Sequence, residues 1–168
     1  MIKFTFDTNI LRDYLESDRP HHSDAVSLVR LDEQGLCEIR VVSRYATDVP
    51  AGDLRNRLDA LAICQRPRIG TIAQWNVSEW NADFWATEKE SKTYAELFNR
   101  IFPAGDRSSR HHKNRSADVG HLLGHIRAKR DIFVTRDGDI LKRKSDLMSN
   151  FGVSVMMPAD AIKACRLK

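Results

Sequence analysis

Four aspartates stand where a parallel α/β sheet would gather side chains for chemistry: Asp7, Asp48, Asp118 and Asp137. Residues 2–6 alternate apolar and polar as a strand does, and Asp7 follows them, whereas Asp137 follows the apolar segment 131–135. The carboxyl ends of such strands lie at one edge of the sheet. Carboxylates gathered there repel one another unless a divalent cation joins them, and hard oxygen ligands favour magnesium or manganese. In a basic chain, this predicts chemistry on phosphate.

Each acid also has a purely structural interpretation. Asp7 is a residue type that caps helix N-termini, and so is Asp48. Asp53 lies shortly after Asp48 and is an alternative to it as a site residue. Ser116 would cap a helix and place Asp118 in its first turn, where the helix dipole stabilises a carboxylate in any case. Both interpretations therefore stay open at every one of these positions.

The Asp137-Gly138 pair is the most ambiguous of the acidic motifs. Asp-Gly between two apolar segments is typical of a β-hairpin. The residues that follow lack the alternation of a strand, so we favour a strand-to-helix turn. In that case Asp139 is either a further metal ligand or a charge at the start of the helix.

Basic residues are concentrated beside the acids rather than spread evenly. The chain has a formal net charge of +4 and a pI of about 9.1. One dense group precedes Asp118 and includes Arg107, Arg110, Lys113 and Arg115. Charge runs usually form solvated surfaces, and such a surface remains the alternative. Cations that flank a carboxylate cluster also suit a polyanion laid across a metal site.

Strand and helix patterns alternate along the chain, which predicts a parallel sheet covered by helices on both faces. Strands are expected at residues 2–6, 37–43, 131–135 and 153–156, with a short additional strand at 69–72. One helix is expected to begin at residues 7–9, a second to run from residue 20 to about 31, and a third to begin at residue 50. A further helix should end at residue 102, another should begin at 116, a short one is expected near 141 and a last one after 158. Residues 103–115 are expected to form a loop.

Composition limits the class of protein. With 168 residues and 42% hydrophobic content, the chain is expected to form one domain, residues 1–168, with an extended middle region at about 74–115. Its three cysteines form no zinc motif, and no apolar run approaches a membrane span. The chain enters a strand pattern at once, without a signal peptide. We therefore expect a cytoplasmic protein that has no membrane partner.

Taken together, the motifs resemble the PIN domain, a metal-dependent nuclease fold found in bacterial toxins of the VapC type and in RNA-processing proteins. Residues 6–11 look like the opening strand with its first acid, 116–122 like the third acid, and 132–137 like a strand ending in Thr-x-Asp. Residues 152–158 resemble the family's closing strand and the start of its closing helix, so the match covers nearly the whole chain. In one departure, Asp48 stands where the family usually has Glu.

The resemblance implies a three-layer fold, with a central parallel sheet of about four to five strands, and an endoribonuclease that cuts single-stranded RNA. Its catalytic acids would be Asp7, Asp48, Asp118 and Asp137, holding one or two Mg²⁺ or Mn²⁺ ions. Asn9 and Thr135 would fix the acids by hydrogen bonds. RNA phosphates would be bound by Arg107, Arg110, Lys113 and Arg115.

The resemblance leaves several partners and roles open. The enzyme could be the toxin of a toxin–antitoxin pair, with an antitoxin protein and a second copy of itself as further partners, and its RNA could be single-stranded or structured. The alternative is a catalytically weak PIN-like protein that binds RNA or acts as a scaffold.

Overall fold

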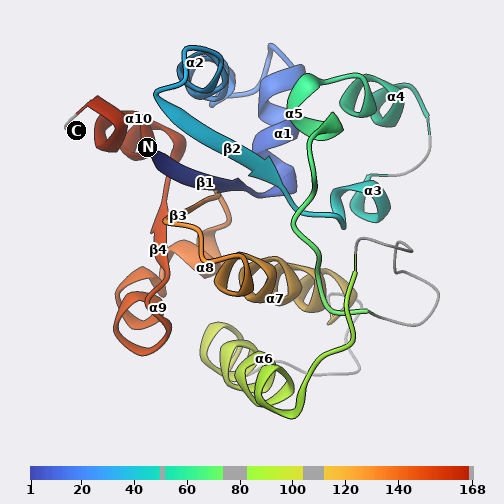
Figure 1. Ribbon diagram of the computed structural model, residues 1–168, viewed down its shortest axis with the longest axis vertical. Coiled ribbons are helices and arrows are strands. Elements are labelled where there is room, and N and C mark those ends of the chain that lie inside the picture. Colours follow the sequence, from blue (N-terminus) through green and yellow to red (C-terminus); the bar gives the residue numbers. More distant parts are fainter. Residues whose placement is uncertain (50–51, 74–82, 104–111, 167–168) are drawn as a thin grey trace.

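Four parallel strands form the central sheet of the computed structural model shown in Figure 1. They are β1 (Ile2–Phe6), β2 (Cys37–Val41), β3 (Ile132–Val134) and β4 (Ser154–Met156), in the order β2-β1-β3-β4. The structure describes residues 1–49, 52–73, 83–103 and 112–166. The sheet is parallel throughout and flanked by helices, which confirms the predicted α/β class.

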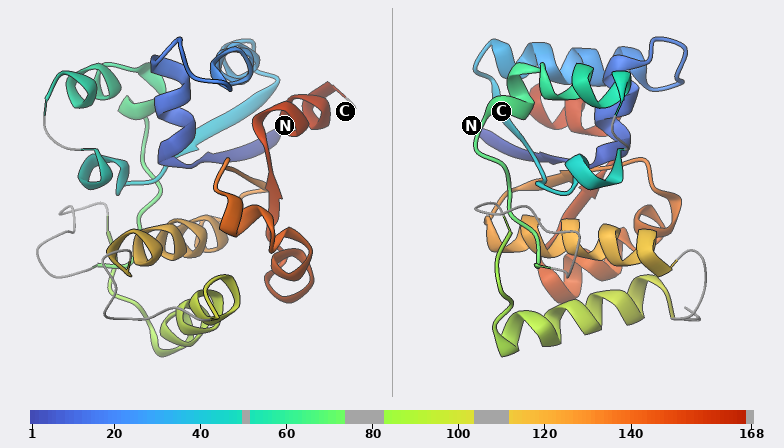
Figure 2. Two further views of the ribbon diagram at one scale, coloured as in Figure 1. Left: turned by 180° about the vertical axis from the view of Figure 1, so that it is seen from behind. Right: turned by 90° about the vertical axis from the view of Figure 1, so that its right-hand side faces the viewer.

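Helices cover both faces of this sheet (Figures 1 and 2). One layer contains α1 (Thr8–Leu15), α2 (His22–Glu33) and α10 (Pro158–Arg166). The opposite layer contains α7 (His112–Arg127) and α9 (Lys144–Phe151), and α6 (Glu88–Ile101) packs on the outside of α7. The remaining helices are short: α3 (Tyr45–Asp48), α4 (Asp53–Asp59), α5 (Ala62–Gln65) and α8 (Gly138–Leu141).

The alternation of strand side chains divides the core in two. On β3, Ile132 and Val134 join the cluster beneath α1, α2 and α10, whereas Phe133 joins the cluster beneath α6 and α7. Successive side chains of a strand point to opposite faces, so a short strand buried on both sides must be apolar throughout. The sequence Ile-Phe-Val meets that requirement, and β3 carries the chain to the edge where Asp137 follows.

Most predicted elements are present, and the structure differs from the prediction at several places. The expected helix start at Ser116 is wrong, because α7 begins at His112, whose ring packs on Phe98 with centroids 5.3 Å apart. Residues 69–72 form isolated bridges, from Val42 to Ile69 and from Ile72 to Phe84, instead of a strand. Helices α3 and α9 were not predicted from the sequence. Within the described ranges, no helix is both long and apolar enough to cross a bilayer.

Two glycines on α7 differ sharply in the space around them. A Cβ added to Gly124 would lie 2.7 Å from the carbonyl oxygen of Gly70 and 3.3 Å from Cγ2 of Ile69. Among the described residues, the nearest atom to a Cβ added to Gly120 would be Cβ of Thr71, at 4.0 Å. The segment after α5 therefore approaches α7 closely at Gly124 and leaves ordinary space at Gly120.

This difference yields a stability prediction with its own control. Gly124→Ala is expected to lower the free energy of unfolding by about 1–3 kcal/mol, because backbone must move to admit the methyl group. Gly120→Ala should be neutral or stabilising by up to about 1 kcal/mol, since alanine is the better helix former. Urea unfolding measures both variants. Equal stability would show that the contact between Gly124 and Gly70 does not constrain the fold.

Candidate active site

The carboxyl ends of β1 and β3 bring two of the four predicted acids to one edge of the sheet. Phe6 pairs with Val134, and the Asp7 amide donates a hydrogen bond to the Val134 carbonyl at 3.1 Å. Asp7 then caps α1, and Asp137, a few residues after β3, caps α8. The strand-to-helix turn predicted at Asp137-Gly138 is therefore confirmed over the hairpin.

The Asp7 carboxylate is buried and receives hydrogen bonds at both oxygens. Oδ1 accepts from the backbone amide of Thr8 at 2.8 Å. Oδ2 accepts from the Thr135 hydroxyl at 2.6 Å and from the side-chain nitrogen Nδ2 of Asn9 at 2.7 Å. Burial alone would raise the pKa of Asp7, but His121, Thr135 and Thr8 outweigh it and lower that pKa. Asp7 is therefore held as an ionised carboxylate.

Asn9 and Thr135 link Asp7 to the chain that carries Asp137. The Thr135 hydroxyl oxygen accepts hydrogen bonds from the Asn9 side chain at 3.1 Å and from the Asp137 amide at 3.0 Å. The side-chain oxygen Oδ1 of Asn9 accepts from the backbone amide of Arg136 at 3.3 Å. These bonds give Asn9 and Thr135 the geometry of positioning residues, which is the role that the family resemblance implies for them.

His121 joins Asp7 to Asp48, a contact that sequence reasoning missed. Its Nδ1 lies 3.2 Å from Oδ1 of Asp7, and its Nε2 lies 3.1 Å from Oδ2 of Asp48. The ring is 1% exposed. Burial alone would lower the pKa of His121, but the two carboxylates raise it to about 10. The signal in the sequence was the spacing, since His121 follows Asp118 by one helical turn.

The second acid of the site is Asp48 rather than its rival Asp53. Oδ2 of Asp48 accepts a hydrogen bond from the Thr8 hydroxyl at 3.2 Å, and its side chain is 22% exposed. The Asp53 side chain is 86% exposed and lies 4.0 Å from Arg57 on its own helix. Asp48 therefore lies at the rim of the site, and Asp53 is a surface residue of α4.

Asp118 lies beyond the first turn of α7, because that helix already includes His112 and so extends before the predicted start at Ser116. Burial raises the pKa of Asp118 to about 8, and the charge of Asp7 adds most to this effect, followed by Asp137 and Asp48. The other three predicted acids therefore all act electrostatically on Asp118. His121 offsets only part of their combined charge.

Asp137 and Asp139 have more ordinary partners than the other acids. Oδ1 of Asp137 accepts the amides of Asp139 and Ile140, at 2.8 and 3.0 Å, as an N-cap does. The exposed Asp139 side chain lies 3.5 Å from Lys142. Asp137 thus combines a capping role with a charge that reaches Asp118, whereas the contacts of Asp139 fit the alternative of a helix-start charge.

The predicted basic loop is described only in part. Arg107 and Arg110 lie outside the described residues, as does the side chain of Lys113, whose backbone belongs to α7. The guanidinium of Arg115 lies over the Phe102 ring, 5.1 Å from its centroid. The prediction of a loop at 112–115 is wrong, because these residues form the first turn of α7, which packs on α6.

The charge of this site suits a divalent cation, although the donors are not arranged around one. Among the described residues, no three acidic, histidine or cysteine side chains form a ready-made metal group. The two ring nitrogens of His121 contact one oxygen of Asp7 and one oxygen of Asp48. A cation would compete with His121 for these oxygens. The pKa of Asp118 is raised to about 8 because burial and the neighbouring acids oppose its ionisation, and a cation bound there would favour the ionised form. The residues therefore fit a hard cation that competes with His121.

Comparison with models of known protein families gave no match for this chain, and comparison with characterised proteins gave none either.

Crowding of the four acids predicts how stability depends on pH when divalent cations are absent. The ordinary pKa of Asp is 3.8, so between about pH 4 and 8 the folded protein keeps a proton on Asp118 that the unfolded chain has lost. Stability therefore falls as pH rises through that window. Asp118→Asn should raise the urea midpoint at pH 8 in chelator and leave it nearly unchanged at pH 4.

The exposed Asp53 provides a matched control for this test. Asp53→Asn should change the free energy of unfolding by no more than about 0.5 kcal/mol at either pH. An Asp118→Asn protein that is no more stable than the wild type at pH 8 would contradict the crowding of charge around Asp118.

Proposed function

We propose that the protein is a metal-dependent endoribonuclease of the PIN type that hydrolyses phosphodiester bonds in single-stranded RNA. The observation that carries the proposal is the buried His121 between Asp7 and Asp48, together with Asp118, on which the charges of Asp7, Asp137 and Asp48 all act. Several carboxylates gathered at the carboxyl edge of a parallel sheet are typical of a site that binds a cation and its ligand.

Asp7, Asp118 and Asp137 would hold Mg²⁺ or Mn²⁺, with Asp48 at the rim. A bound cation of this kind lowers the pKa of a water molecule and polarises a phosphate. The chain's own residues supply orientation: Thr135 and Asn9 fix the Asp7 carboxylate, and the Thr8 hydroxyl fixes Asp48. His121 balances the charges of Asp7 and Asp48.

The finer parts of the proposal have narrower support. RNA as the substrate is supported by the positive net charge and by basic residues on both sides of Asp118 in the sequence. A toxin role, an antitoxin partner and a homodimer are supported by the family resemblance alone.

A catalytically weak RNA-binding or scaffold protein is the second candidate, and His121 favours it. Both oxygens of Asp7 already receive hydrogen bonds, and the His121 imidazolium provides the positive charge between Asp7 and Asp48. If this arrangement is permanent, His121 replaces the cation and the protein binds RNA without cutting it.

The nuclease proposal predicts that the purified protein cleaves single-stranded RNA with Mg²⁺ or Mn²⁺ and stops in excess chelator. Asp7→Asn should lower the cleavage rate at least about a hundredfold, because an amide is a poor ligand and leaves the other acids misplaced. Circular dichroism should show an intact fold. Asp53→Asn should cleave like the wild type, and undiminished cleavage by Asp7→Asn, or in chelator, would exclude the mechanism.

A second experiment separates the enzyme from the scaffold by measuring manganese binding directly. His121→Gln removes a positive charge and frees oxygens of Asp7 and Asp48, so its affinity for Mn²⁺ should rise about tenfold over the wild type at pH 7. Titration calorimetry measures both proteins. Measurable binding by the wild type supports the nuclease. Binding only after His121 is replaced supports the scaffold, and binding by neither protein removes the metal site.

A further inference from the structure

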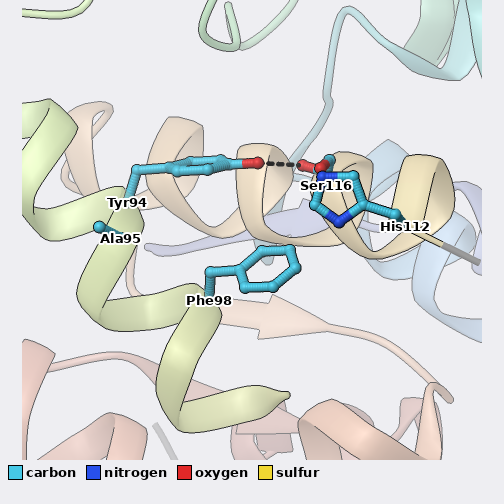
Figure 3. A pocket seen from close by; sticks show the side chains of 5 residues that line it. All are labelled: Tyr94, Ala95, Phe98, His112 and Ser116. Atoms are coloured by element: carbon cyan, nitrogen blue, oxygen red, sulfur yellow. Dashed lines mark hydrogen bonds between the residues drawn. The ribbon is translucent and has the colours of Figure 1, made fainter. Parts of the chain in front are cut away.

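A cavity of about 250 Å³ lies between α6 and the first turns of α7, outside the acidic cluster. Figure 3 shows its lining: Tyr94, Ala95 and Phe98 come from α6, and His112 and Ser116 come from α7. Ligand pockets for drug-sized molecules are mostly larger, at about 300–1,000 Å³. This cavity therefore suits a single small planar group.

Aromatic side chains make up most of the cavity wall. The Tyr94 and Phe98 rings stand one helical turn apart on α6, with centroids separated by 6.4 Å and planes inclined by 33°. The His112 ring faces Phe98 from α7, at 5.3 Å. Aromatic walls of this kind bind flat π systems by stacking, with little dependence on the exact ring.

One residue of the cavity wall also has a buried polar atom without a partner. Nδ1 of His112 is buried and makes no hydrogen bond in the part of the chain that the structure describes. The Tyr94 hydroxyl, in contrast, donates to the Ser116 carbonyl at 3.2 Å, which fixes the ring in place (Figure 3). A buried ring nitrogen without a partner costs free energy unless a ligand supplies one. A flat ligand with hydrogen-bonding edges would do so.

The cavity and the acidic cluster share one turn of α7. Ser116 lines the cavity, and Asp118 follows two residues later on the same helix. Burial raises the pKa of Tyr94, and the charges of Arg44 and Asp118 act on its hydroxyl in opposite directions. The charge of Asp118 therefore reaches the Tyr94 hydroxyl in the cavity wall, and the Arg115 guanidinium lies over Phe102, whose ring is 5.6 Å from that of Phe98 in the same wall.

We propose that this cavity binds one nucleobase of the RNA strand, beside the nucleotide whose phosphate lies at the acidic cluster. The occupant must be flat, about the size of one base, able to hydrogen-bond with His112, and joined to a polyanion that reaches Asp118 and Arg115. A base within a single strand meets all four requirements. The inference rests on the proposed function, because it assigns the substrate to that site.

The test compares an oligouridine with an oligomer of the same length whose residues are all abasic. Both have the same sugar–phosphate charge, so their difference in affinity measures the bases alone. Excess chelator prevents cleavage, and fluorescence anisotropy then reports binding directly. The wild type should bind the oligouridine more tightly, and Tyr94→Ala should reduce that preference about fivefold or more, the effect of losing one stacked base.

Two further variants control the experiment. Tyr14→Ala truncates a tyrosine that lines a different cavity, with residues of α1 and α2, and should keep the preference of the wild type. His112→Phe keeps a ring against Phe98 but removes Nδ1, so it should retain stacking and change the relative affinities for oligouridine and oligoadenosine. If Tyr94→Ala does not fold, His112→Phe provides the test.

Base binding and catalysis can fail independently. A wild type that cuts RNA but binds abasic and intact oligomers equally overturns the base pocket and leaves the nuclease standing. A wild type that prefers intact oligomers through Tyr94 but never cuts RNA supports the pocket and overturns the nuclease. The pocket is also overturned if folded Tyr94→Ala keeps the wild-type preference for oligouridine over the abasic oligomer and His112→Phe keeps the wild-type ratio of affinities for oligouridine and oligoadenosine.

Discussion

The buried Asp7 carboxylate is the constraint on which the candidate site depends, since it joins three elements that are distant in sequence. It caps α1 through the Thr8 amide, accepts the Thr135 hydroxyl at the end of β3, and contacts His121 from α7. A buried carboxylate is costly unless hydrogen bonds satisfy it, so the three elements must meet at this point for the charge to be tolerated. The same requirement that stabilises the sheet edge therefore assembles the site.

Local rules account for the parts of the site that the sequence could predict. Alternation in residues 2–6 followed by an N-cap type at Asp7 defines β1 and α1, and the absence of alternation after Gly138 favours a helix. These signals depend on neighbouring residues, and a parallel sheet then places both strand ends at one edge. Asn9, two residues after Asp7, and Thr135, directly after β3, therefore lie beside Asp7 at that edge.

Long-range packing decided what local rules could not. α7 already includes His112, whose ring packs on Phe98 of α6, a contact that helix capping cannot reveal. Residues 69–72 form only single bridges, from Val42 to Ile69 and from Ile72 to Phe84, and Ile69 and Gly70 lie against Gly124 of α7. The position of His121 required both the register of α7 and the fold of α3, because its two carboxylate partners lie 114 residues before it and on a separate short helix.

The two central acids differ in how their charge is compensated, and this difference says where a cation would act. Asp7 has a lowered pKa because the protein supplies donors to both oxygens, whereas Asp118 has a raised pKa because burial and three other acids oppose its ionisation. Pairs of acids driven apart in this way are typical of sites that divide structural and chemical roles. Asp7 therefore organises the site, and Asp118 is the group whose charge depends on what binds there. A cation that binds at neutral pH would displace the Asp118 proton, so its affinity would increase as pH rises.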